Sequence, residues 1–109
     1  MTERTSGADI VASALATVRA GALPTDMTLR QMAVLGILCD EPGLHRVRTL
    51  AKEIGAQKPV VTRILDRFEQ MGIAQRLPDH DDRRDLFIVA TAEGIELRAK
   101  LGKLAASQL

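Results

Sequence analysis

The 109-residue sequence predicts a mainly α-helical domain that carries one small β-hairpin. Three observations support this fold class. Apolar residues recur at helical spacing over most of the chain, glycines and prolines separate these stretches, and one charged segment near residue 80 is followed by a short apolar run. A chain of this length is expected to form one domain, which we assign to residues 8–109, whereas the polar residues 1–7 are expected to be disordered.

The first two helices are expected at residues 8–23 and 28–40. Gly21 and Pro24 are placed to end the first helix. Thr28 is placed to cap the second, because a hydroxyl before an apolar run can accept hydrogen bonds from the free N–H groups of the first turn. The second helix is apolar on nearly every side and is expected to form a buried spine.

Residues 47–71 are expected to form two helices separated by Gly55. Pro59 suits the first turn of the second of these helices, because backbone N–H groups there have no hydrogen-bond partner within the helix and the one that proline lacks is not needed. The outer face of that helix is polar and includes Thr62 and Arg63. A core stripe at helical spacing lies opposite and consists of Val61, Ile64, Leu65, Phe68 and Met71. This arrangement is typical of a helix-turn-helix.

The remaining elements are a hairpin over residues 74–90 and a final helix over residues 91–109. Residues 74–77 and 86–90 are the expected strands, and Thr91 is placed to cap the helix that follows. A helix-turn-helix followed by such a hairpin makes a winged helix-turn-helix, which is the fold that we predict.

The charge of the chain is unevenly distributed. The net charge is +1, yet residues 44–76 carry an excess of four positive charges. This distribution favours a DNA-facing segment, although a solvated face would also produce it. Only two residues are aromatic, which argues against a binding platform for single-stranded nucleic acid, because such platforms stack bases on aromatic side chains.

The sequence gives little support to an enzyme, a metal site or a cofactor, and we expect none of the three. It holds no serine–histidine–acid arrangement and no phosphate-binding glycine loop. Asp79, His80 and Asp81 make a weak metal site, because the segment lacks the glycine and the final glutamate of a calcium loop. Cys39 lies in an apolar stretch and is expected to be a buried residue rather than a redox-sensing thiol. Without a signal peptide or membrane-spanning stretch, the protein is expected in the cytoplasm.

Several motifs of the chain resemble those of the MarR family of bacterial transcription regulators. The resemblance covers residues 27–97 and includes the stretch "QKPVVTRILDRFEQMGIAQR" at residues 57–76. The motifs that carry it are Thr-Leu-x-Gln from Thr28, Leu-Ala-x-x-Ile-Gly from Leu50, Asp-Arg-Arg at Asp82, Arg83 and Arg84, and Thr-x-x-Gly from Thr91 to Gly94.

The resemblance implies a sequence-specific regulator of transcription that binds double-stranded DNA, expected at a palindromic operator. One helix would enter the major groove and a wing arginine would reach the minor groove. We favour Arg83 for this contact, with Asp82 and Arg84 forming a pair that supports it. The roles of the two arginines could be exchanged. The alternative is that Asp82, Arg83 and Arg84 form only a structural salt bridge in the turn. The implied DNA-binding residues are Arg46, Arg48, Gln57, Lys58, Pro59, Val60, Thr62, Arg63, Arg67, Arg83 and Arg84.

The ends of the chain depart from the family pattern. Family members continue into long terminal helices that dimerise and enclose a ligand pocket, whereas this sequence stops soon after residue 100, so the case for a small-molecule effector is weak. Apolar residues at both ends nevertheless predict a homodimer through the terminal helices. The residues assigned to it are Ile10, Leu15, Val18, Leu97, Leu101 and Leu104. The alternative function is a winged-helix protein–protein interaction module that has lost DNA binding.

Overall fold

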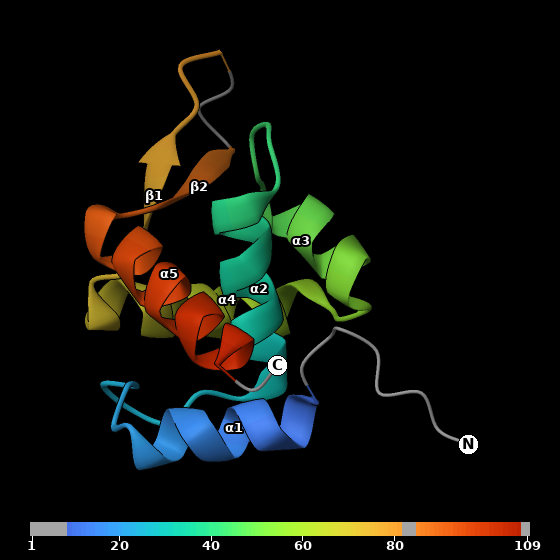
Figure 1. Ribbon diagram of the computed structural model, residues 1–109. Helices are drawn as coiled ribbons and strands as arrows, with labels where there is room; N and C mark the ends of the chain where they lie inside the picture. The colour runs from blue at the N-terminus through green and yellow to red at the C-terminus, as the bar shows by residue number, and fades with distance from the viewer. Residues whose placement is uncertain (1–8, 82–84, 108–109) are drawn as a thin grey trace.

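The computed structural model describes residues 9–81 and 85–107, which form five helices and one two-stranded antiparallel hairpin (Figure 1). In chain order the elements are α1 (Ile10–Arg19), α2 (Leu29–Asp40), α3 (Val47–Ile54), α4 (Lys58–Met71), β1 (Ala74–Pro78), β2 (Leu86–Ala90) and α5 (Ala92–Ala106). The predicted fold class, a mainly α-helical winged helix-turn-helix, is confirmed. Residues 1–7, for which disorder was expected, lie outside the described residues.

Three helices end in the same hydrogen-bonded turn around a glycine. Gly21, Gly55 and Gly72 follow α1, α3 and α4, and their φ angles of 60°, 63° and 75° lie in the left-handed region that glycine tolerates. In each turn the residue after the glycine donates to the carbonyl five residues earlier: Ala22 to Thr17, Ala56 to Ala51, and Ile73 to Phe68. This Schellman motif satisfies carbonyls that the helix leaves free, and it ends the helix.

The first of these turns corrects the expected extent of the first helix. We expected residues 8–23, whereas α1 begins at Ile10 and ends at Arg19. The start is fixed by the Asp9 carboxylate, which accepts a 2.8 Å hydrogen bond from the Val11 N–H. The end is earlier than expected because Gly21 occupies the left-handed position and so stops the helix two residues before itself.

The start of α2 explains the Thr-x-x-Gln pattern of the sequence. The Thr28 hydroxyl accepts from the Gln31 N–H at 3.0 Å, and the Gln31 side-chain carbonyl accepts from the Thr28 N–H at 2.9 Å. This capping box confirms Thr28 as the N-cap. The helix is not buried on every side, however. Only one face is, with Val34, Leu35 and Leu38 covered while Leu29 is 67% exposed.

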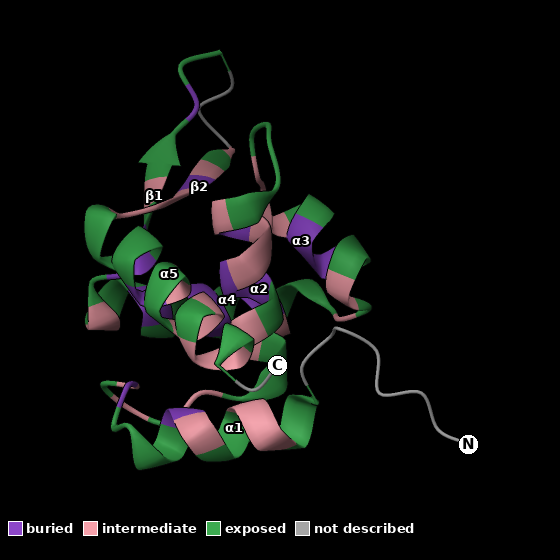
Figure 2. Ribbon diagram, viewed as in Figure 1, coloured by how far each residue is buried: buried purple, intermediate pink, exposed green. Residues whose placement is uncertain are grey.

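The core forms where α2, α3, α4, α5 and the hairpin meet, and the purple segments of Figure 2 mark buried residues in it. Four members of the predicted α4 stripe are buried and the fifth, Met71, is half-buried. The largest side chains with almost no exposed surface are Phe68, Leu35, Leu50, Leu65, Ile88, Val34 and Val61. Each such burial stabilises the fold by about 1.5–3 kcal/mol, which is more than a typical helix cap provides.

The junction between the hairpin and α5 explains the Thr-x-x-Gly pattern. Thr91 is the N-cap of α5, as predicted, and its hydroxyl accepts from the Gly94 N–H at 3.1 Å. The same hydroxyl donates to the Gly72 carbonyl at 2.6 Å, which ties the start of α5 to the end of α4. α5 spans Ala92–Ala106, and residues 108 and 109 of the expected helix lie outside the described residues.

The middle of the hairpin is attached to His45, which lies two residues before α3. β1 and β2 pair from Ala74 opposite Ala90 to Pro78 opposite Leu86. The Ile88 N–H of β2 donates to the His45 carbonyl at 2.9 Å, as a third short strand would accept. Because His45 adjoins the start of α3, this bond fixes the hairpin against the helix-turn-helix.

No helix in the described parts of the chain combines the length and the apolar character that crossing a membrane requires.

The approach of α5 to the hairpin predicts a cost for a side chain at Gly94. A Cβ at this position would lie 2.0 Å from the Ile73 carbonyl oxygen, so Gly94→Ala must displace backbone. We expect the free energy of unfolding to fall by about 1–3 kcal/mol, measured by urea denaturation. Gly102→Ala in the same helix is the control, because its Cβ would meet only the flexible end of Arg98. It should keep or raise stability by up to about 1 kcal/mol. Equal losses in both variants would contradict this explanation.

Candidate nucleic-acid interface

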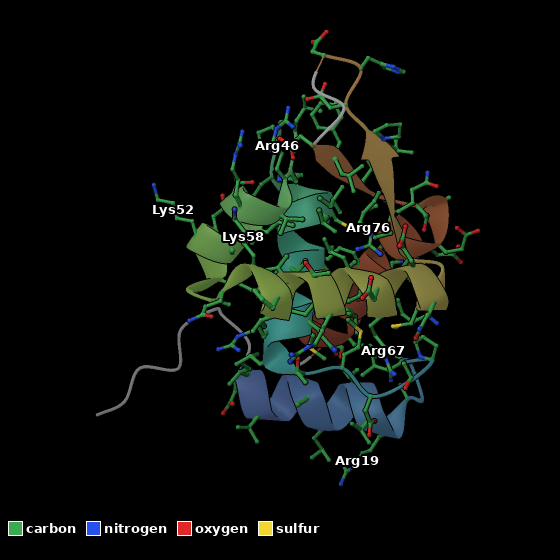
Figure 3. The ribbon with its side chains drawn as sticks, turned by 180° about the vertical axis from the view of Figure 1, so that it is seen from behind. Arg19, Arg46, Lys52, Lys58, Arg67 and Arg76 are labelled. Carbon is green, nitrogen blue, oxygen red and sulfur yellow. The ribbon has the colours of Figure 1, made fainter. Side chains whose placement is uncertain are left out.

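The outer face of α4 presents polar side chains to solvent. Lys58, Thr62 and Arg63 are exposed, opposite the buried stripe of the same helix. Gln57 is the N-cap residue, makes no side-chain capping bond and is exposed, as is Pro59 in the first turn. Figure 3 shows Lys58 at the beginning of α4 on the same side of the molecule as Lys52 of α3. A helix of this kind can place donors along the major groove of a duplex.

Val60 and Arg67 differ from the other candidates on α4. Val60 is half-buried against the core, so less of its surface is open to a base than we expected. Arg67 donates to the Thr25 hydroxyl at 2.8 Å. That bond directs it to the segment between α1 and α2, and in Figure 3 it lies on the α1 side of α4. These contacts link Arg67 to the frame of the domain.

Arg76, on β1, is held by two acids of α4. Its guanidinium donates to Glu69 and, at 2.6 Å, to Asp66. The side-chain hydrogen bond from Arg76 holds the pKa of Glu69 below its usual range. The associated stabilisation is therefore present at neutral pH and is lost as the pH falls through that lowered pKa. Arg76 contributed to the basic excess of residues 44–76, but the structure uses its charge internally.

Arg46, which we expected to bind DNA, is engaged by two carboxylates of the wing, the hairpin unit of residues 74–90. Its Nη2 lies 2.9 Å from Oδ2 of Asp79 and its Nη1 lies 2.5 Å from Oδ2 of Asp85. The guanidinium also lies over the Phe87 ring, 4.3 Å from the ring centroid. Hydrogen bonding to Asp79 is the largest of the effects that raise the pKa of Arg46. Only 21% of the Arg46 side chain is exposed, so its position does not suit a phosphate contact.

Arg48 differs from Arg46 although both flank the start of α3. Its side chain is 64% exposed, and its Nη2 is 3.7 Å from Asp85. Its exposure leaves the phosphate contact expected for Arg48 a prediction. The wing residues Asp82, Arg83 and Arg84 lie outside the described residues, so the roles expected for them stay predictions.

The residues expected at a dimer interface separate into two groups. Ile10, Leu15 and Val18 of α1 are 61%, 48% and 69% exposed. With Val11, which is 73% exposed, they make up a set of exposed apolar side chains that we call the α1 surface. Leu101 and Leu104 of α5 are half-buried. Leu97 is a correction, because it is only 7% exposed and fills the core of the single chain, which leaves it no surface for a second copy.

Hollows lie beside several of these elements. A groove of about 800 Å³ separates the N-terminal half of α2 from α3 and α4, and Arg63 is at its edge. A smaller hollow of about 280 Å³ lies between α1, α2 and α5, lined mainly by apolar side chains such as Met27, Met32 and Leu101. Among residues 9–81 and 85–107, no three His, Cys, Asp or Glu side chains come together as metal ligands.

Comparison with known proteins identifies the family. The MarR family model matches residues 27–86, which is more than half of the chain and includes α2, the helix-turn-helix and most of the wing. The chain belongs to the MarR family. The resemblance seen in the sequence is therefore confirmed.

Individual MarR relatives agree with this assignment. Transcriptional regulator HosA of Escherichia coli O157:H7 is 32% identical over 74 residues, which cover 68% of this chain and 54% of HosA, so the chain spans about half the length of that relative. The crystal structure of transcriptional regulator Tm0710 from Thermotoga maritima is 29% identical with a TM-score of 0.71, covering 89% of this chain and 63% of that one. Both are named as regulators, in agreement with the expectation that the chain is not an enzyme.

A further structural relative was solved with a ligand. CouR from Rhodococcus jostii RHA1, bound to p-coumaroyl-CoA, is 26% identical with a TM-score of 0.70, covering 91% of this chain and 66% of CouR.

The surroundings of Cys39 predict a thiol of low reactivity. Burial is the largest effect that raises the pKa of Cys39, and the charge of Asp40 adds to it while Arg98 opposes it. We expect iodoacetamide to alkylate Cys39 more slowly than it alkylates a cysteine-containing peptide. When the rate is measured from about pH 7 to 10, the pH at which it reaches half its maximum should be higher for Cys39 than for the peptide. Asp40→Asn should increase the rate and Arg98→Met should decrease it. A wild-type rate equal to that of the peptide would contradict the effect of burial.

Proposed function

We propose that the protein is a sequence-specific transcription regulator that binds double-stranded DNA through the outer face of α4. The observation that carries this proposal is the exposure of Lys58, Thr62 and Arg63 on the second helix of a helix-turn-helix, which belongs to a family whose named relatives are regulators. The orientation of α4 supports it, because burial of the opposite stripe leaves these side chains facing outward.

The exposed residues have different proposed roles at the duplex. Arg63 is suited to a bidentate contact with guanine, whereas Lys58 in the first turn acts as a point charge toward phosphate. Gln57 can bond to adenine from the leading edge of the helix. Arg48, which is exposed on α3, contacts the phosphate backbone of the DNA. The proposal also includes a wing arginine at the minor groove.

We further propose that two copies associate through the α1 surface. Four exposed apolar side chains on one short helix are more than an isolated domain of this size needs, and burying them would remove apolar area from water. A two-fold arrangement would also present two α4 helices, as a palindromic site requires.

A small-molecule effector is not part of the proposal. CouR, a relative of this fold, was solved with p-coumaroyl-CoA, so the doubt about an effector gains no support from the comparisons. In this chain, the hollow between α1, α2 and α5 has a volume of about 280 Å³ and lies at the lower end of the range for ligand pockets.

DNA binding is tested by selection from a random-sequence duplex library, followed by fluorescence anisotropy with the enriched duplex and a scrambled one. We expect the enriched duplex to bind at least about 1,000-fold more tightly at near-physiological salt. Arg63→Ala should weaken binding to it by about 1–3 kcal/mol, and Lys58→Ala should lower the salt slope by about one. Lys103→Ala, which removes an exposed lysine from the last turn of α5, is the control. Absence of any enriched sequence would favour the interaction module instead.

The dimer is tested by sedimentation velocity on variants of the α1 surface. Val18→Glu should dissociate the protein to monomers, because a carboxylate in an apolar interface loses its hydration. Leu44→Glu is the matched control, since Leu44 is 65% exposed and lies in the segment between α2 and α3, away from α1. A wild-type protein that sediments as a monomer at micromolar concentration would overturn the assignment.

A further inference from the structure

The two acids at the ends of the wing loop meet on one arginine from another element. Asp79 follows β1 directly, and Asp85 directly precedes β2. Arg46 lies at the start of α3 and donates to both, through Nη2 to Asp79 and through Nη1 to Asp85. The loop is also closed by the backbone, because the Asp79 N–H donates to the Asp85 carbonyl at 3.2 Å. One guanidinium therefore spans the two positions where the chain leaves and re-enters the hairpin.

The surroundings make this cluster more than a surface ion pair. The Asp79 side chain is 7% exposed and those of Arg46 and Asp85 are 21% and 23% exposed, so water screens their charges poorly. Phe87 covers one face of the guanidinium. The adjoining His45 carbonyl accepts from the Ile88 N–H, which holds the backbone before Arg46 against β2. Arg46 is thus fixed between α3 and the wing by side-chain and backbone contacts.

The side chain of Arg46 is not needed to complete α3. It is the N-cap residue, but its backbone N–H is satisfied by the Thr49 hydroxyl at 3.0 Å, and its side chain makes no capping bond. The long side chain is therefore directed to the wing. A bidentate guanidinium suits this task, since it can hold two carboxylates at fixed positions where a lysine would act as a point charge.

We propose that Arg46 is a positioning residue for DNA binding: with Asp79 and Asp85 it forms a latch that sets the wing relative to the helix-turn-helix. This proposal rests on the proposed function and replaces the direct DNA contact expected for Arg46. Since α3 and α4 are joined through the turn at Gly55, the latch holds the wing and the α4 face in one rigid unit.

A first experiment examines the latch without DNA, by amide hydrogen exchange. Arg46→Met should accelerate exchange at the amides of Asp79 and Ile88 by about tenfold, because their acceptors are held by the latch. Arg98→Met is the matched control, as it removes one arginine from the Arg98–Asp40 ion pair between α5 and α2. Unchanged exchange at both amides in Arg46→Met would overturn the latch, whatever the DNA result.

A second experiment uses the sign of the effect on DNA affinity. Removing acids from a DNA-binding surface should tighten binding on electrostatic grounds alone. The latch predicts the opposite: Asp79→Asn with Asp85→Asn weakens binding to the enriched duplex by about tenfold. Asparagine can still accept the hydrogen bonds that Asp79 takes from the Asp81 N–H and Asp85 takes from the Leu86 N–H, so the local turns are kept. Tighter binding by this double variant would overturn the proposal.

Non-additivity separates positioning from direct contact. Arg46→Met should weaken binding by about tenfold, and the two asparagine substitutions should add little to it, because the latch is already open. A direct phosphate contact would instead give tighter binding when the acids are removed in either background. Arg46→Lys should restore affinity only in part. Arg98→Met, with the same change in charge, should bind like the wild type. If the wild type binds no duplex while the exchange result holds, the proposed function fails and the latch stands as a structural link.

Discussion

Burial of the inner face of α4 is the constraint on which the rest of the structure depends. Val61, Ile64, Leu65 and Phe68 lie in a core cluster shared with α2, α3, α5 and the hairpin, and in the described part of the chain no other helix places as many side chains in the core. This burial fixes the rotation of α4 about its own axis, and so determines which residues face outward. The glycine turns at Gly55 and Gly72 then set the direction of α3 relative to α4 and the direction in which β1 continues from α4.

The charged residues serve two different purposes in this small domain. Arg46, Arg76 and Arg98 each join separate elements through acids, and their side chains are only 21%, 22% and 37% exposed. Exposed ion pairs contribute about 0–1 kcal/mol to the free energy of folding. The Arg98–Asp40 pair therefore does more to orient α5 relative to α2 than to stabilise the domain. The latch at Arg46 is better covered, because the Asp79 side chain is 7% exposed, so removing its arginine partner would be costly. The cations that stay exposed, such as Lys58 and Arg63, are those available to a partner.

The proposals for this MarR family protein are connected through geometry. An α4 face selects bases only if the wing and the second copy are placed correctly beside it, so a fixed wing and a fixed dimer both determine affinity. The latch controls the first of these and the α1 surface the second. Because the two lie at opposite ends of the domain in Figure 1, their effects on binding should be independent.

The sequence by itself determined the class of fold, the family, the core stripe of α4 and the caps at Thr28 and Thr91, because each depends on residues close together along the chain. Only the tertiary structure decided which charges are available. Arg46 and Asp79 are 33 positions apart, and Arg67 and Thr25 are 42 apart, so no local pattern indicates their pairing. The same holds for Leu97, whose place in the core follows from the packing of α5 against the other helices. Periodicity identifies an apolar face, but the elements that cover it are brought together only by folding.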